Sequence, residues 1–325
     1  MLDKSIPHIG ILMTKTDTKN YPRFELPIGF AFCGYKAGYE KEWADLMFEL
    51  GQTDTLKQAQ EVFENEFLSK PELLQKQCLF VLDKSGEVAA CGSLWHGEHF
   101  GKQLWRIHWI ATKPNYQGKG LIKALLTKLL DIYNELGFDG FVYLTSQTWS
   151  YKAINLYSKF GFMPYKGEKP QNWKTENYDS ENNKAWQIID SKIAEYKIKQ
   201  ISDSIAPCGL VCKLCHFADS CGGCKSETNC CGSRKSDEGC YQYNCCEEKG
   251  FDGCWQCEIA PCDKGMFSES HDIRLRAFIT YIKRNGKDKL ADRLYHNAQN
   301  GVHYGHGKDY DNLDSINAVI ERIEG

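Results

Sequence analysis

The chain has 325 residues, a formal net charge of −3 at pH 7 and 16 cysteines. This length suits two domains, and the small net charge excludes a global attraction to nucleic acid or anionic lipid. No stretch approaches the roughly 20 apolar residues of a membrane span, and the first residues lack the segments of a signal peptide. We therefore expect a cytoplasmic protein with no membrane or nucleic-acid partner, in which clustered cysteines bind metal.

The first half of the sequence alternates between strand and helix patterns, which predicts an α+β fold. In chain order the expected elements are helices at 43–50 and 56–67, strands at 78–82, 88–95 and 104–112, a helix at 121–136, a strand at 141–145 and a helix at 151–160. Gly137 and Gly161 follow the last two helices and are expected to end them.

A glycine-containing turn lies between the strand at 104–112 and the helix that begins at Leu121. A strand, a glycine-rich turn and a helix together can bind phosphate, because free N–H groups at the helix start point toward the anion. Gly118 and Gly120 are too few for a dinucleotide-binding fingerprint, and no Gly-Lys-Ser/Thr sequence marks a nucleotide P-loop. Taken alone, the turn is equally compatible with an ordinary helix start.

Two motifs in order resemble the GCN5-related N-acetyltransferase (GNAT) family over about residues 23–165. The first is Pro-Asn-Tyr-Gln-Gly-Lys-Gly at 114–120 before an apolar helix, and the second is the segment 153–162. The family's phosphate motif, Gln/Arg-x-x-Gly-x-Gly/Ala, is matched by Gln117 and Gly120, whereas Ile122 stands where a small residue is usual. The resemblance implies a mixed, splayed β-sheet flanked by helices, with the acyl donor between the fourth and fifth strands.

The resemblance also implies acetyl-CoA as the acyl donor and a set of backbone contacts to it. The residues expected to bind the pyrophosphate through their N–H groups are Gln117, Gly118, Lys119, Gly120, Leu121 and Ile122. Ile110, Ala111 and Thr112, at the end of the preceding strand, would pair with the pantetheine arm. The acceptor would be a small-molecule or peptide amine that the sequence does not identify.

Tyr157 falls on the family's general-acid tyrosine and would give a proton to the departing CoA thiolate. The alternative is that Tyr157 only packs its helix against the sheet. Deprotonation of the acceptor amine requires a base, for which His108 is a candidate, as are Glu98 and His99. Each of these three is also compatible with a solvated or hydrogen-bonded residue.

The polar segment 166–184 is predicted to be a connector, and 185–201 fits either a strand or an amphipathic helix. We therefore expect an acetyltransferase domain at 1–170, a linker or last element at 171–204, and a cysteine-rich domain at 205–325 with a helical C-terminal part.

Thirteen of the sixteen cysteines lie between 208 and 262 and are the candidate metal ligands. They are Cys208, Cys212, Cys215, Cys221, Cys224, Cys230, Cys231, Cys240, Cys245, Cys246, Cys254, Cys257 and Cys262. Three pairs have two intervening residues, the spacing that lets both sulfurs reach one ion. Zn²⁺ is the leading prediction, an iron–sulfur cluster the alternative and disulfides the third choice, while His216 and His271 could each replace a cysteine.

The cysteine-rich segment resembles small domains of the DUF3795 type over about residues 205–265. The matching motifs are Cys208 to Cys215, Cys221 to Cys224, and Cys254 to Cys262 with Pro261. The resemblance implies a metal-stabilised domain but gives no activity.

These patterns together predict an N-acetyltransferase fused to a metal-binding module that serves structure, substrate binding or recruitment of a protein partner. The alternative is an acyl-CoA-binding protein without turnover, whose cysteine module senses metal or redox state or docks another protein.

Overall fold

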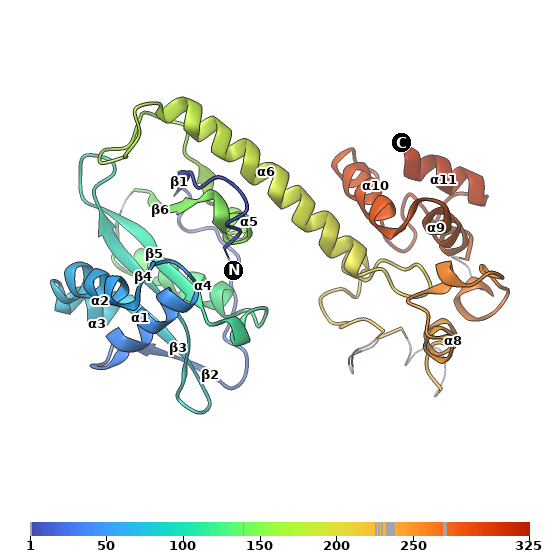
Figure 1. Cartoon of the computed structure of the whole chain (residues 1–325), viewed down its shortest axis with the longest axis horizontal. Coiled ribbons are helices and arrows are strands. Elements are labelled where there is room, and N and C mark those ends of the chain that lie inside the picture. The colour runs from blue at the N-terminus through green and yellow to red at the C-terminus, as the bar shows by residue number, and fades with distance from the viewer. Residues whose placement is uncertain are drawn as a thin grey trace. The chain divides into compact units, whose positions relative to one another are not determined.

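The computed structural model describes residues 2–138, 140–224, 226, 228, 230–231, 238–268 and 272–325 (Figure 1). The chain forms two compact units, Met1–Ile193 and Ala194–Gly325. The division falls within the long helix α6, Tyr178–Asp203. Among the described residues, none of the helices combines the length and the apolar character that a membrane span requires.

The first unit is built on a seven-stranded mixed sheet with the order β2-β3-β4-β5-β6-β1-β7. The strands are β1 Gly10–Lys15, β2 Phe30–Gly34, β3 Cys78–Asp83, β4 Val88–Gly97, β5 Leu104–Thr112, β6 Val142–Gln147 and β7 Met163–Pro164. Neighbouring strands are antiparallel except β5 and β6, which are parallel. The expected mixed sheet is thus confirmed.

Helices cover both faces of this sheet, since alternate residues of a strand point to opposite sides. On one face lie α1 Tyr39–Glu49, α2 Leu56–Phe63, the π-helix Glu64–Leu68 and α3 Pro71–Gln77. Their buried aromatic residues, Trp43 and Phe63 among them, pack on Phe80 of β3. Figure 1 shows α1, α2 and α3 grouped beside the sheet.

The other face is covered by α4 Leu121–Glu135, α5 Tyr151–Lys159 and the first part of α6. Leu125 and Leu129 of α4 pack with Ile107 of β5 and Leu144 of β6 in one continuous core. The two cores together hold the strand ends near residue 112 between two layers of helices.

The pairing between β5 and β6 is short. A single pair, Arg106 with Tyr143, joins these strands in the described part of the sheet. On its other side β5 pairs with β4 through a bulge, at which Trp109 has a φ of 50°. The bulge lies opposite Gly92, which has no side chain to obstruct it. The short pairing thus lies between the fifth and sixth strands of this chain and not between the fourth and fifth, because β4 and β5 pair along most of their length.

Most of the expected elements agree with the structure, but two predictions at the linker need correction. Residues 166–184 are not a connector throughout, because α6 begins at Tyr178. The strand alternative for 185–201 is wrong, because this segment is helical and buries Ala185, Trp186 and Ile189 in the first core. A long polar helix with one short apolar face gave too weak a pattern for a choice.

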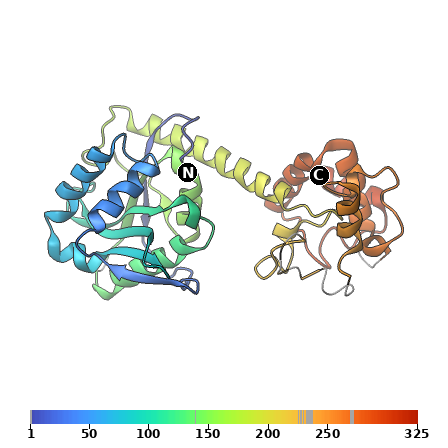
Figure 2. The same ribbon diagram turned by 60° about the horizontal axis from the view of Figure 1, so that its bottom comes forward.

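The second unit contains α8 Tyr241–Lys249, α9 Asp272–Asn285, α10 Lys287–Gln299 and α11 Ile316–Glu324 (Figure 2). Short 3₁₀ turns lie at Cys212–Leu214, Cys254–Gln256 and Gly265–Ser268. Phe278 and Tyr281 of α9 pack with Leu290 of α10 and Val319 of α11 in one core. The C-terminal helices expected from the sequence are therefore present, and they form a core of their own.

We predict that Gly92→Ala destabilises the first unit. A Cβ atom at this position would lie 2.3 Å from Cδ1 of Ile110 and 3.0 Å from Cδ2 of Leu125, so β4, β5 or α4 must shift. We expect a loss of about 1–3 kcal/mol of unfolding free energy in urea titrations. Gly140→Ala is the control, because its Cβ would meet only Oη of Tyr133 at 3.9 Å. An equal effect of both substitutions would contradict the proposed crowding.

Candidate functional site

The turn before α4 has the backbone that the sequence analysis expected for a phosphate site. Residues Pro114–Tyr116 form a 3₁₀ turn, and Gly118 and Gly120 have φ values of 79° and 84°. A Cβ atom at either glycine would meet nothing within 4 Å, so no crowding requires glycine here. Glycine is favoured instead because the backbone at both positions is left-handed. The turn is tied to β5 because Nε2 of Gln117 donates to the carbonyl of Thr112 at 3.4 Å.

This turn offers a run of backbone donors without acceptors. In the described structure no acceptor is found for the N–H groups of Gly118, Lys119, Gly120, Leu121 and Ile122. The N–H of Gln117 differs from these, since it donates to the carbonyl of Pro114 at 3.2 Å. These five successive donors lie at the start of the 15-residue helix α4, at the positive end of its dipole. Such an arrangement favours the binding of an anion.

A lysine adds positive charge beside these donors. Nζ of Lys119 lies 4.8 Å from the centre of the Tyr116 ring and 6.0 Å from that of Phe30. The aromatic rings thereby restrict the lysine to the neighbourhood of the turn.

The end of β5 presents one paired edge and one edge without ladder partners. Ala111 and Thr112 pair with Cys91 and Ala90 of β4. Toward β6 no described pair extends beyond Arg106. The backbone of Ile110 to Thr112 therefore lies next to the turn with one edge available to an extended ligand.

Tyr157 projects from α5 into the core between α4, α5 and the sheet. It is 7% exposed, and its ring makes an edge contact with Phe162 at 6.3 Å. Burial raises the pKa of its hydroxyl well above the ordinary value of 10. The phenol is accordingly protonated at neutral pH, the state that a proton donor must have.

His108 lies on the opposite face of the sheet, in a cluster whose central residue the sequence analysis missed. Glu66 accepts hydrogen bonds from Nε2 of His108 at 2.6 Å, from Nε1 of Trp109 at 2.9 Å and from Arg106. The Glu66 side chain is 24% exposed and those of His108 and Arg106 are 12% and 14% exposed. Glu66 belongs to the π-helix, so no helical periodicity marked it, although short π segments are frequent at functional sites.

The charges of this cluster follow from its contacts. Burial by itself raises the pKa of Glu66, but the hydrogen bond and charge of His108, with Trp109 and Arg106, lower it to about 2. Burial and the Arg106 charge lower the pKa of His108 to about 4, although Glu66 acts in the other direction. At neutral pH Glu66 is therefore ionised and His108 neutral. Because a carboxylate only accepts, Nε2 of His108 carries the proton and Nδ1 the lone pair.

The two other base candidates lie apart from this cluster. Nδ1 of His99 lies 3.0 Å from the hydroxyl of Tyr143, and burial lowers the pKa of His99 below its ordinary value. Glu98 is exposed in the loop after β4. Of the three candidates, His108 alone is oriented by a half-buried carboxylate in the described structure.

One family model matches the part of the chain that contains this site. Residues 38–162 match the acetyltransferase (GNAT) family. This GNAT segment runs from α1 to the residues after α5 and contains the phosphate-type turn, Glu66, His108 and Tyr157. No curated protein matches the chain.

Solved structures resemble part of the chain at low identity. They include a GCN5-related N-acetyltransferase from Sphaerobacter thermophilus, with 21% identity over 49% of this chain and 49% of that chain and a TM-score of 0.38. A GNAT-family acetyltransferase from Colwellia psychrerythraea has 13% identity and a TM-score of 0.37. The match covers 48% of this chain and 53% of that protein. Glucosamine-6-phosphate N-acetyltransferase from Arabidopsis thaliana has 19% identity and a TM-score of 0.33. The match covers 45% of this chain and 99% of that protein. The chain spans about half the length of the Sphaerobacter protein.

Cys245 and Cys246 belong to α8, and the other cysteines of the second unit lie in loops and short turns. Cys208, Cys240, Cys246 and Cys254 are buried, and the other nine are half-buried. No disulfide joins these cysteines, all of which lie within the described residues. Across the described ranges no three His, Cys, Asp or Glu side chains converge closely enough to hold a single ion. His271, a predicted substitute ligand, lies outside the described residues.

We predict that Glu66→Gln changes the dependence of stability on pH. The pKa of Glu66 is lower in the folded protein, about 2, than its ordinary value of 4.5, so its ionised form stabilises the fold above pH 4.5. This contribution, on the order of 3 kcal/mol, is lost as the pH falls toward 2. Urea titrations should show a larger free energy of unfolding for the wild type than for Glu66→Gln at pH 7. The difference between the two free energies should narrow below pH 4.5.

Glu64→Gln is the matched control, because Glu64 belongs to the same π-helix and is exposed. A Glu66→Gln variant that follows the wild-type pH profile throughout would contradict the buried ion pair.

Proposed function

We propose that the first unit transfers an acetyl group from acetyl-CoA to a primary amine of a small molecule or peptide. The observation that carries this proposal is the run of five N–H groups without acceptors from Gly118 to Ile122, placed directly after the open edge of β5. A donor that combines a diphosphate with an amide-containing arm fits both features at once. The match of residues 38–162 to the GNAT family supports the same donor.

In this proposal the N–H groups from Gly118 to Ile122 bind the pyrophosphate of acetyl-CoA. The amides of its pantetheine arm pair with the backbone of Ile110, Ala111 and Thr112 as an added strand would. The thioester then lies beside the single Arg106–Tyr143 pair, where β5 and β6 separate. N–H groups of β5 stabilise the oxyanion that forms when the amine attacks.

The acid and the base would act from opposite faces of the sheet. His108 accepts a proton from the acceptor ammonium at Nδ1, while the ionised Glu66 holds Nε2 and stabilises the imidazolium that results. The neutral amine attacks the thioester carbonyl, and the nitrogen of the tetrahedral intermediate loses its second proton to solvent. Collapse of this intermediate forms the amide and expels the CoA thiolate. Tyr157, on the α5 side, gives that thiolate its proton. Glu66 acts through His108 and is therefore a positioning residue.

For the second unit, thiolate ligation by its cysteines remains a prediction from their spacing. Zn²⁺ is the ion that the pairs Cys212/Cys215 and Cys221/Cys224 favour, because each pair can supply two sulfurs from a tight turn. The DUF3795-like pattern supports a structural or recruiting role, and no step of acetyl transfer is assigned to it.

We predict that removing the diphosphate from the donor abolishes most of its affinity. S-acetylpantetheine keeps the thioester and both amides but offers no anion to the turn at Gly118–Ile122. Calorimetry should give a dissociation constant weaker than that of acetyl-CoA by roughly 100-fold or more, since each hydrogen bond to a charged group contributes about 1.5–3 kcal/mol. Equal affinities of the two donors would contradict the anion site.

We predict that Tyr157→Phe lowers kcat by about 100-fold or more and leaves the affinity for acetyl-CoA nearly unchanged. The assay follows release of free CoA with a panel of amines, and thermal melts check the fold. Tyr151→Phe, on the same helix α5, is the control. An unchanged kcat would reassign Tyr157 to packing. Acetyl-CoA binding without CoA release for any amine would favour the alternative of an acyl-CoA-binding protein.

A further inference from the structure

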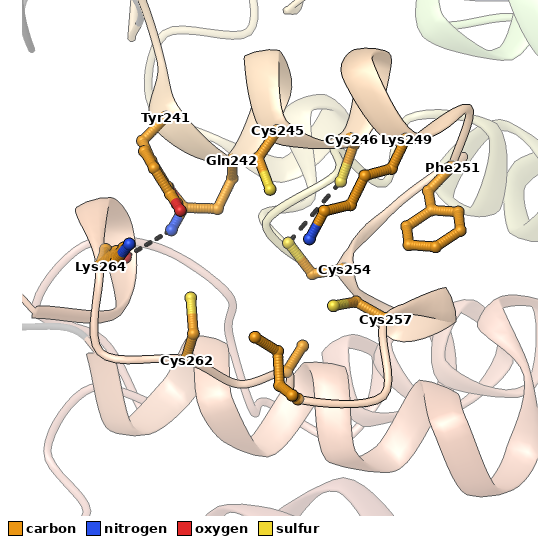
Figure 3. A pocket seen from close by; sticks show the side chains of 12 residues that line it. Tyr241, Gln242, Cys245, Cys246, Lys249, Phe251, Cys254, Cys257, Cys262 and Lys264 are labelled. Atoms are coloured by element: carbon orange, nitrogen blue, oxygen red, sulfur yellow. Dashed lines mark hydrogen bonds between the residues drawn. The ribbon is translucent and has the colours of Figure 1, made fainter.

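The second unit contains a cavity of about 80 Å³ between α8 and the segment 254–264. Five cysteine side chains line it, namely Cys245, Cys246, Cys254, Cys257 and Cys262. Figure 3 shows their sulfurs directed into one common space. The remaining walls include Phe251 and Ile259, so the sulfurs lie against apolar surface.

Hydrogen bonds fix the two sides of this cavity. Nε2 of Gln242, on α8, donates to the carbonyl of Lys264 at 2.5 Å, and its Oε1 accepts from the N–H of Met266 at 2.9 Å. Opposite α8, the N–H of Cys257 donates to the carbonyl of Cys254 at 3.0 Å, which closes the turn between them. These bonds tie α8 to the backbone at Lys264 and Met266 and close the turn that carries Cys254 and Cys257.

The cavity is too large for a single thiolate-bound ion. Four sulfurs around one zinc lie about 2.3 Å from it and therefore about 3.8 Å from one another, with no space left between them. The sulfurs of Cys246 and Cys254 lie 3.8 Å apart, but no three described His, Cys, Asp or Glu side chains converge on one point. One water occupies about 10–15 Å³ on the same measure, so a cavity of about 80 Å³ has room for several atoms.

The charge around the cavity also indicates an anionic occupant. Its lining residues include two lysines, Lys249 and Lys264, and no carboxylate. Figure 3 shows the Lys249 side chain extended toward the sulfurs of Cys254 and Cys257. Four thiolates around an inorganic core that contains sulfide give a net negative centre, which these lysines would offset.

We infer that this cavity binds an iron–sulfur cluster through Cys245, Cys254, Cys257 and Cys262. Cys246 is the fifth thiol and is 3% exposed. Its Sγ lies 3.8 Å from that of Cys254, where its S–H supports the ligating sulfur by a hydrogen bond. The site is independent of the proposed acetyl transfer, because all its residues belong to the second unit.

The test uses the full-length protein purified without oxygen, or reconstituted with ferrous iron and sulfide in the presence of a thiol reductant. We expect iron and acid-labile sulfide in similar amounts per chain, with sulfide-to-iron absorption in the visible range. Cys257→Ser and Cys262→Ser should each lower the iron content several-fold. Cys33→Ser, a half-buried cysteine of the first unit that is not a candidate ligand, is the control and should retain the iron. Protein that takes up zinc alone, or that loses iron in the control but not in the cavity variants, would overturn the inference.

A second measurement needs no variant and remains decisive if a substitution prevents folding. Iron-loaded wild-type protein is treated with an alkylating agent before and after removal of iron by a chelator, and each cysteine is followed by peptide mass spectrometry. Cys245, Cys254, Cys257 and Cys262 should be protected until iron is removed. Equal alkylation of these four thiols in both states would contradict cluster binding at this cavity.

Discussion

The short pairing between β5 and β6 is the constraint on which the rest of the first unit depends. In a sheet covered by helices on both faces, backbone N–H and C=O groups are normally paired, because leaving them buried and unpaired costs free energy. Here the described ladder between β5 and β6 is the single pair of Arg106 and Tyr143. In the turn after β5, the five N–H groups from Gly118 to Ile122 also lack acceptors in the described structure. Both sets of groups lie at the same end of β5, so one extended anionic ligand can satisfy both.

The same constraint separates the two chemical environments of the site. The bulge at Trp109 changes which residues of β5 face each side, so that His108 and Trp109 both contact Glu66 beneath the α1–α3 layer. Tyr157 lies in the core under α4 and α5. A reaction that needs a neutral base and a protonated acid at neutral pH can draw them from two faces of one sheet without either neutralising the other.

The sequence was sufficient to predict the strands from Cys78 to Thr112 and the helix α4, because the periodic spacing of their apolar residues is unambiguous. Glycines also mark the ends of the helices. It was insufficient to predict β1, whose apolar run is only Ile11 to Met13. It also missed β2, which lies at the edge of the sheet and has no fully buried residue to mark it. The turn at Gly118 and Gly120 could be predicted because a left-handed backbone conformation favours glycine. The place of Glu66 in the site could not be predicted, because it arises from contacts with His108 and Arg106, which lie 42 and 40 residues away in the sequence.

The π-helix at Glu64–Leu68 has a consequence for how this site could arise or be lost. A π turn accommodates one more residue than an α turn, so the side chains on either side of it differ in rotational phase around the helix axis. Phe63 and Phe67, which flank Glu66, both reach the core, while the carboxylate between them reaches β5. Deletion of one residue in this segment would restore regular winding and rotate the acid toward solvent without altering a single residue of the sheet. The length of this helix alone would thus decide whether Glu66 reaches His108.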